Sequence, residues 1–544
     1  MGETPDPRTM TSEEVLTRKR FLGTSAAAVG AISGLGALAN PSQAFGRIDE
    51  ISRFLGASAG TLTWAVEGGA ARFFDPAGAS SIGDLVGIEH IFEALTRINS
   101  RGVAEPWLIT DLPKRIGAKQ VSVQLRNGLV FNDGSPLTSA DVVFTYQRHM
   151  NPKTVSIHGP ALATLQSVRA DGPRRVIFTL KEYTDYFPIT LGVIKIFSAA
   201  GVRSQGAAKH FLKPLGSGVF EVAELSPQIS YRLVRNENYK GRQPAPSLDE
   251  VIQIGVASGP SRVARLRSGA FDVIDHVPIS DVASLGRVPG ISVGEALGSA
   301  QVNMEFEHSK PPFNDVRVRQ AFMHALDPSA ISKLVFRGRA KPAHSMLARN
   351  NPYYVEPKTK YRHNPSRARQ LLAQAGHANG LDFEMLVATD VVFIPAVAQV
   401  MQQQLEEVGL RAKLRLTTIN GGYSLALEGK YQCYLSYYNI GLFSDPVDYY
   451  YRFATYGGNG EAYYRWKDKF AKRFVALVDA AYVSTSFRQR RRRYGQAQEL
   501  LNQQVPGAVP ILYVPVISGW RDEVKGFTTP ANDLSDFRRV RVTS

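Results

Sequence analysis

Residues 121–148 show two hydrophobic patterns in succession. Apolar and polar residues first alternate, and apolar residues then recur at the spacing of one helix face. Apolar side chains at every second position, Val121, Val123 and Leu125, have the period of a half-buried strand. Two turn signals come next, an Asn-Gly pair and the run NDGSP. Thr138 is then placed to cap a helix, and Asp141 three residues on resembles the second partner of a capping box. The pattern therefore predicts a strand, two turns and a capped helix.

The same patterning predicts a first strand at Thr61–Val66 and a mixed α/β chain beyond it. With 544 residues the chain is too long for one core, so we expect two or three lobes. Hydrophobic residues make up 44% and charged residues 21%, which is ordinary for a globular protein.

Residues 1–44 have the pattern of an export signal. Arg18-Lys19-Arg20 precedes an uncharged stretch, and Ser42-Gln43-Ala44 resembles a cleavage site, so we expect the mature chain to begin at Phe45 in the periplasm. The string TRKRFLG resembles a twin-arginine signal, with Lys19 in place of the second arginine, so the export route stays open. An uncleaved signal anchor is the alternative. The chain has one cysteine, Cys433, so no cysteine near residue 44 can carry a lipid, and a lipoprotein is not expected.

The net charge is +16, from 64 basic and 48 acidic side chains. Such a balance is compatible with nucleic acid, an anionic surface or an anionic solute. The densest cluster, Arg488 to Arg493, precedes a helical pattern, so we expect most of these arginines on a solvated helix face. An exported chain rarely meets nucleic acid, and we expect none as a partner.

Catalytic and metal motifs are missing from the sequence. There is no HExxH, GxSxG, Walker A loop or pair of CxxC motifs, and the histidines lack ligand spacing. Cys433 lies in an aromatic run and is expected to be a buried, inert thiol. We therefore expect no enzyme activity, no cofactor and no metal held by the protein.

The string LRNGLVFNDGSPLTSADVVFTYQR at 125–148 resembles the signature of the peptide/nickel (family 5) extracytoplasmic solute-binding proteins of ABC importers. PPFNDVRVRQA at 311–321 resembles a second family motif, and other segments follow in the family's order. The resemblance implies an α/β fold of the large periplasmic-binding-protein type, with two hinge-linked lobes and the ligand in the cleft between them. The implied boundaries are lobe I at 45–303 with an extra subdomain at about 96–212, lobe II at 304–503, and a return to lobe I at 504–544.

The resemblance also implies a function. It predicts a monomeric periplasmic receptor that captures a small peptide, a peptide-like solute or another polar solute by hinge closure. The receptor would deliver this solute to an ABC permease and ATPase complex. The alternatives are a signalling receptor or chaperone of the same fold and, last, an exported enzyme.

Two segments carry the binding residues that the resemblance implies, and they contain Ser80, Ser81, Ile82, Tyr437, Tyr438, Asn439, Leu442 and Asp445. In oligopeptide binders the second segment reads GWxxDYxxP, and its aspartate pairs with the peptide α-amino group. Leu442 stands in that place. Asp445 or Asp448 could substitute, although Asp445 stands next to a proline and is equally suited to capping a turn. Half of the 22 tyrosines lie between 423 and 464, where they either line a cleft or pack in lobes. Tyrosines in place of an aspartate favour neutral or anionic solutes.

Overall fold

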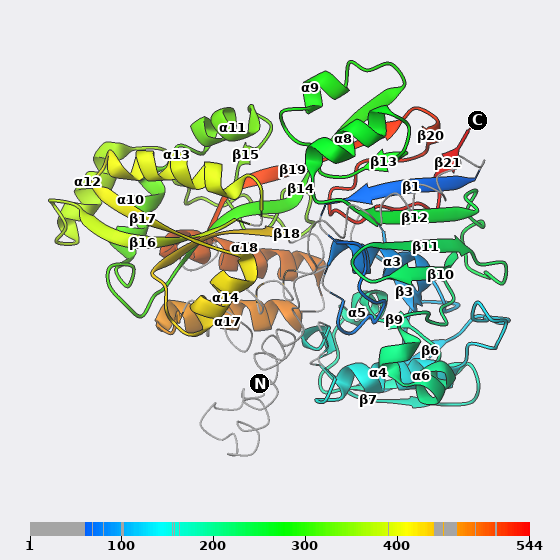
Figure 1. Cartoon of the computed structure of the whole chain (residues 1–544). Helices are drawn as coiled ribbons and strands as arrows, with labels where there is room; N and C mark the ends of the chain where they lie inside the picture. The colour runs from blue at the N-terminus through cyan, green and yellow to red at the C-terminus, as the bar shows by residue number, and fades with distance from the viewer. Residues whose placement is uncertain are drawn as a thin grey trace.

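The computed structural model describes residues 60–543 except 68, 80, 100–102, 155, 157, 163, 390, 440–445, 447–449, 451–464, 485 and 506–508. An 11-stranded sheet runs through both halves of the molecule, in the order β10-β11-β12-β1-β13-β19-β14-β18-β16-β17, with β15 paired to β19 (Figure 1). No helix in these residues is long and apolar enough to cross a membrane.

The half of the sheet around β1 forms lobe I. Its strands are β1 (Thr61–Val66), β10 (Phe220–Ser226), β11 (Ser230–Arg235), β12 (Glu250–Gly255) and β13 (Val273–Ile274). β1 is the predicted first strand, and it pairs in parallel with β12 and β13. Leu62, Trp64 and Val66 pack on one face of the sheet with α3 (Ile82–Ile91), whereas Ala65 packs on the other face with α8 (Gly259–Arg267). A strand buried on both faces reads as a continuous apolar run, as TLTWAV does.

A subdomain of lobe I contains the strand–turn–helix unit that the pattern predicted. β6 (Gln120–Gln124) is followed by α4 (Ser139–Met150), and Thr138 and Asp141 form the capping box. The strand, the cap and the helix are thus confirmed. β6 belongs to a four-stranded sheet with β5 (Lys114–Arg115), β7 (Leu165–Ala170) and β8 (Arg175–Leu180), over a core of its own.

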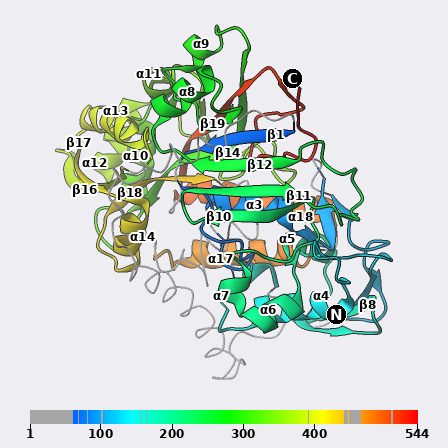
Figure 2. The same cartoon turned by 45° about the vertical axis from the view of Figure 1, so that its right-hand side comes forward.

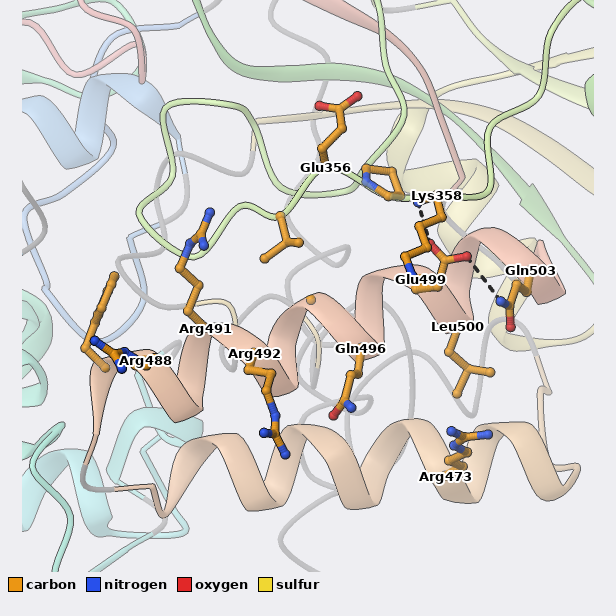
Figure 3. Close-up of a pocket in the computed structure, with 14 residues that line it drawn as sticks. Glu356, Lys358, Arg473, Arg488, Arg491, Arg492, Gln496, Glu499, Leu500 and Gln503 are labelled. Atoms are coloured by element: carbon orange, nitrogen blue, oxygen red, sulfur yellow. Dashed lines mark hydrogen bonds between the residues drawn. The ribbon is translucent and has the colours of Figure 1, made fainter.

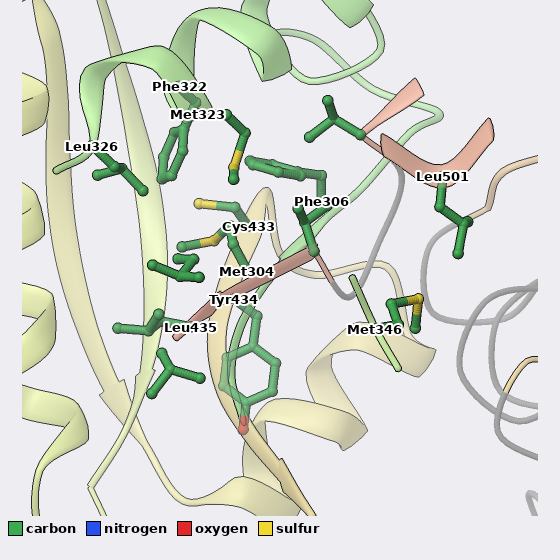
Figure 4. Packing of buried hydrophobic residues seen from close by; sticks show 14 of the residues in the cluster. Met304, Phe306, Phe322, Met323, Leu326, Met346, Cys433, Tyr434, Leu435 and Leu501 are labelled. Atoms are coloured by element: carbon green, nitrogen blue, oxygen red, sulfur yellow. The ribbon is translucent and has the colours of Figure 1, made fainter. Parts of the chain in front are cut away.

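Lobe II is the other half of the sheet with its helices. Its strands are β16 (Leu381–Ala388), β17 (Leu410–Thr417) and β18 (Cys433–Asn439), and its helices are α10 (Val316–Ala325), α11 (Pro328–Phe336), α12 (Pro365–Gln374), α13 (Ile394–Glu406), α14 (Ile419–Leu427), α17 (Lys469–Tyr482) and α18 (Phe487–Gln504). Figure 4 shows Cys433 packed beside Met304 and Phe306. The thiol is fully buried, as predicted, and burial raises its pKa well above the usual value.

Two long strands join the lobes. β14 (Ile291–Phe306) and β19 (Val509–Arg521) pair with each other along most of their length. One end of this pair contacts β13 of lobe I and the other contacts β18 of lobe II. The β14–β19 register shifts between Leu297 and Gln301, where the chain passes from one lobe to the other. Figure 2 shows the same crossing from the side.

Shorter elements connect these parts. These elements are β2 (Glu93–Ala94), β3 (Thr96–Ile98), β4 (Ala104–Pro106), α5 (Phe187–Val193), β9 (Lys195–Ile196), α6 (Ala199–Gln205), α7 (Ala207–His210), α9 (Val282–Leu285), β15 (Lys341–Pro342), β20 (Val524–Lys525) and β21 (Arg541–Val542). The last two pair with each other in lobe I.

Candidate functional site

Charged side chains gather where two parallel strands of lobe I end. Glu67 directly follows β1, and Asp275 and His276 directly follow β13. Because β1 and β13 are parallel neighbours, their carboxyl ends meet at the same edge of the sheet. The Glu67 N–H donates to Asp275 Oδ1 at 2.7 Å, which ties the two strand ends together.

His276 is the centre of this cluster. Its Nδ1 lies 3.4 Å from Asp275 Oδ2 and 3.8 Å from Glu67 Oε2, and its Nε2 lies 3.5 Å from Asp533 Oδ1. Burial alone would lower the pKa of His276, but the carboxylates of Asp275, Asp533 and Glu67 raise it to about 10. The imidazole is therefore protonated at neutral pH.

The backbone of the cluster is strained. His276 has φ 44° and Asp533 has φ 60°, both in the left-handed region that favours glycine. A non-glycine residue held there costs on the order of 1–3 kcal/mol and is typical of functional sites. The Arg262 guanidinium, itself buried, donates to the carbonyls of His276 and Asp275 and so supports the turn after β13.

The cluster carries more negative than positive groups. Glu67, Asp275 and Asp533 supply three carboxylates, and His276 is the one imidazolium among them. Arg262 lies 3.9 Å from Glu67, but its guanidinium also serves the carbonyls of the turn. With its side chain 28% exposed, His276 is open to solvent in part. The site can therefore accept a positively charged group.

Tyr437 of lobe II is influenced by the charges of the same cluster. It lies on β18, and its ring packs edge-on against Phe393 with centroids 5.5 Å apart. Burial, followed by the negative charges of Asp533 and Glu67, raises the pKa of the Tyr437 hydroxyl well above its usual value. A lobe II residue thus lies within electrostatic range of the lobe I cluster.

Tyr438, the next residue, serves the interior of lobe II. Its hydroxyl donates to Glu305 Oε1 at 2.5 Å, and Ser436 Oγ donates to the same oxygen at 2.5 Å. Glu305 is fully buried, and Tyr438 also stacks on Tyr423 with ring centroids 6.0 Å apart. These contacts describe a packed polar group, which is what buried carboxyls require.

The other predicted binding residues lie in several places. Ser81 caps α3, where its hydroxyl accepts a hydrogen bond from the Asp84 N–H, and Ile82 is the first helical residue. Asn439 ends β18 opposite Ala300 of β14. Ser80, Leu442 and Asp445 lie outside the described residues, as does the predicted signal at 1–44. The binding roles of all eight residues remain predictions.

The acidic cluster was not among the predicted binding residues. The sequence carried a signal for it, because Glu67 and the Asp275-His276 pair each follow an apolar strand directly. The sequence could not show that β1 and β13 are neighbours. It also could not show that Asp533, which is 258 residues further along the chain than Asp275, lies 3.5 Å from His276.

 The tertiary structure therefore brings Asp533 into the cluster, and no local sequence pattern indicates it.

Two arginines at the start of α10 make structural contacts. Arg317 forms an ion pair with Asp315, and buried Arg319 donates to the carbonyls of Phe313 and Val505. No group of His, Cys, Asp and Glu side chains within the described part of the chain has the arrangement of a metal site.

Two α/β lobes joined by a pair of long strands define the class of two-lobed periplasmic binding proteins. The solved structures agree. The periplasmic binding protein DppA of Helicobacter pylori, in complex with the peptide STSA, superposes with a TM-score of 0.77 at 21% identity, covering 89% of this chain and 98% of that one. At this identity the likeness shows the fold alone.

Comparison with the sequences of known proteins identifies the family of this chain. Residues 103–461 match the family described as bacterial extracellular solute-binding proteins, family 5. The chain belongs to this family. It is 29% identical over 291 residues to a putative ABC transporter peptide-binding protein of Brucella ovis, covering 52% of this chain and 54% of that protein. It is 24% identical over 475 residues to the dipeptide-binding protein of Escherichia coli, covering 81% and 86%. The chain thus spans about half the length of the first of these relatives.

Proposed function

We propose that this protein is the solute receptor of an ABC importer and that it captures a small peptide, a peptide-like solute or another polar solute by hinge closure. It performs no chemistry of its own. The observation that carries the proposal is the strand pair β14–β19, which runs from one lobe to the other. Two adjacent strands with a register shift at Leu297–Gln301 are the kind of connection about which two lobes rotate.

The cluster around His276 supports a solute with a positively charged group. Leu442 stands where oligopeptide binders have the aspartate that pairs with an α-amino group, so another acid must serve such a solute. Glu67, Asp275 and Asp533 supply that charge from lobe I, and Tyr437 of lobe II lies within range of the charges of Asp533 and Glu67. This favours cationic or zwitterionic solutes over the neutral or anionic ones that the tyrosines alone suggested.

Location and partners form part of the same proposal. Family membership and the signal-like pattern of residues 1–44 support export to the periplasm with cleavage before Phe45 and without a lipid anchor. We place lobe I at 45–303, with its subdomain at about 96–212, lobe II at 304–503, and the return to lobe I at 504–544. The partners are a permease and ATPase complex, and the receptor acts as a monomer without nucleic acid.

Thermal unfolding with a solute panel tests the function. Ligands that bind only the folded state raise the melting temperature by mass action. Unmodified di- and tripeptides are expected to raise it, and N-acetylated versions of the same peptides, which lack the ammonium group, are expected to raise it less. A panel of peptides, opines, sugars and metal chelates that produced no shift would contradict the proposal.

Substitution of Leu442 by Asp tests the α-amino anchor separately. The new carboxylate is expected to raise the affinity for peptides with a free amino terminus, because a hydrogen bond to a charged group contributes about 1.5–3 kcal/mol. Unchanged affinity in calorimetric titration would show that the 437–445 segment does not hold the amino terminus.

A further inference from the structure

A groove on lobe II lies apart from the junction of the lobes. It has a volume of about 820 Å³ and follows the outer side of α18, between α17 and the segment 355–358 (Figure 3). It runs from Arg488 to Gln503, which is about 22 Å at 1.5 Å per helical residue. The groove is therefore long enough for a linear ligand.

Cationic side chains dominate its walls. They are Lys358, Arg473, Arg488, Arg491 and Arg492. In Figure 3 Arg491 extends from α18 toward the 355–358 segment, and Arg492 extends toward α17. Among the described residues, Arg473, Arg488 and Arg492 form no ion pair with a carboxylate, so their charges are available to a ligand.

The two carboxylates of the groove are already engaged. Glu499 accepts hydrogen bonds from the Lys358 N–H at 2.7 Å and from Thr359 Oγ1 at 2.6 Å. Glu356 forms an ion pair with Lys360 at 2.5 Å and another with Arg349 at 3.4 Å. Neither carboxylate neutralises the arginines of α18.

The arrangement of the arginines is unfavourable for the isolated helix. Arg488 is four residues from Arg492 and three from Arg491, and like charges at these spacings destabilise a helix. By contrast, Arg490 of the same run is buried and donates to the carbonyls of Ala481 and Ser484. Arg491 and Arg493 also donate to backbone carbonyls, those of Tyr354 and Ala480. Within the described part of the chain, Arg488 and Arg492 are the arginines of the run that make no such contact.

Apolar side chains also line the groove. They are Val355, Pro357, Leu500 and Phe487, and Phe487 is 56% exposed. Gly495 allows the close approach of the 355–358 segment, since a Cβ there would lie 2.8 Å from Val355 Cγ2. Apolar side chains among spaced cations suit a chain that alternates apolar and acidic side chains.

We propose that this groove is the docking site for an acidic, partly apolar segment of a partner protein. The length of the groove and the separation of its cations favour an extended polypeptide over a compact phosphate, which would need converging donors. Its concave form favours a polypeptide over the surface of an anionic membrane. This proposal does not depend on the solute or on hinge closure.

The test measures binding of a fluorescent eight-residue peptide in which glutamate alternates with leucine. The mature protein is expected to bind it at low salt, more weakly as salt rises, and to ignore the same peptide with lysine in place of glutamate. The double variant R488E/R492E is expected to weaken binding at least tenfold. Glutamate at position 488 lies in the first turn of α18, where a negative charge is compatible with the helix.

A matched control has the same change in net charge on lobe I. Lys119 and Lys213 are exposed there, and K119E/K213E is expected to bind the acidic peptide within twofold of the unchanged protein. Equal losses in both double variants, or no binding of the peptide at low salt, would overturn the proposal. A third outcome would favour a membrane surface instead. In it, the protein sediments with phosphatidylglycerol vesicles, R488E/R492E abolishes this sedimentation, and the acidic peptide does not compete with the vesicles. Solute-induced thermal shifts are expected to be the same in all these proteins.

Discussion

Tyr437 and Tyr438 are neighbours on β18, and their side chains meet different parts of the molecule. The Tyr437 hydroxyl is close enough to Asp533 and Glu67 for their charges to raise its pKa. The Tyr438 hydroxyl donates to buried Glu305. Alternation along a strand sends successive side chains to opposite faces, so one of the pair can face the junction while the other packs inside lobe II.

Phenylalanine substitutions separate these two roles. Y438F leaves the buried Glu305 carboxyl with one donor fewer and is expected to lower the free energy of unfolding by about 1–3 kcal/mol. Y437F is expected to change it by less than about 0.5 kcal/mol and to reduce the thermal shift caused by unmodified di- and tripeptides. Urea unfolding and thermal shift measure the two effects. The reverse pattern would place Tyr438, rather than Tyr437, in the binding site.

His276 gives the stability a dependence on pH. Its pKa is about 10 in the folded protein and about 6.5 in an unfolded chain, so its stabilising charge is present in full below pH 6.5 and is lost as pH rises toward 10. Relative to H276Q, the unchanged protein is expected to gain on the order of 2 kcal/mol at pH 6, after allowance for solvent screening. Urea unfolding at pH 6, 8 and 10 measures the difference, which should shrink with each step. A constant difference would mean that His276 is not an imidazolium in the cluster.

At the scale of elements, α3 shows a predicted binding residue in a structural position. Ser81 accepts from the Asp84 N–H, and Asp84 Oδ2 accepts from the Ser81 N–H at 3.3 Å, so the two form a capping box. This arrangement satisfies donors at the helix start that have no partner within the helix.

Two substitutions at Ser81 test that role. S81A is expected to lower the free energy of unfolding by about 1 kcal/mol, and S81D, which keeps a capping oxygen, is expected to restore most of it. Both values come from urea unfolding. If S81D bound solutes as poorly as S81A while recovering its stability, Ser81 would also contact the solute.

Strand β14, which runs between the lobes, is tightly packed at Gly298. A Cβ at this position would lie 1.7 Å from the Ala531 carbonyl oxygen, so the backbone would have to move. G298A is expected to destabilise the protein by about 1–3 kcal/mol. G117A is a control, because its Cβ would approach no atom closer than 3.7 Å. Equal free energies of unfolding for the two variants in urea would show that the backbone at Gly298 can move without loss of stability.

Local signals explain which elements the sequence could predict. Thr61–Val66 and the Thr138–Asp141 cap are properties of neighbouring residues, and the structure has both. The expectation that most arginines of 488–493 are solvated holds for Arg488, Arg491 and Arg492, whereas Arg490 is buried because α17 ends beside it and supplies carbonyl acceptors. The His276 cluster depends on strand order and on a segment that returns from the end of the chain, which no local pattern encodes.

At the scale of the whole molecule, the subdomain of lobe I also contacts lobe II. The Arg490 guanidinium lies 4.9 Å above the ring of Tyr186, and Thr184 Oγ1 donates to the Tyr482 carbonyl at 3.1 Å. Tyr186 belongs to the same buried cluster as the core of lobe II. The subdomain of lobe I therefore packs on lobe II here, and the proposed closure of the lobes is expected to involve these contacts.

The distance between the lobes tests hinge closure most directly. Dyes attached through K213C on lobe I and K413C on lobe II report it by energy transfer, and Cys433 is fully buried and will not compete for them. With a mixture of unmodified di- and tripeptides, the two dyes are expected to move to one shorter distance at the concentrations that raise the melting temperature. Peptides that raise the melting temperature and leave the distance unchanged would contradict capture by closure of the two lobes.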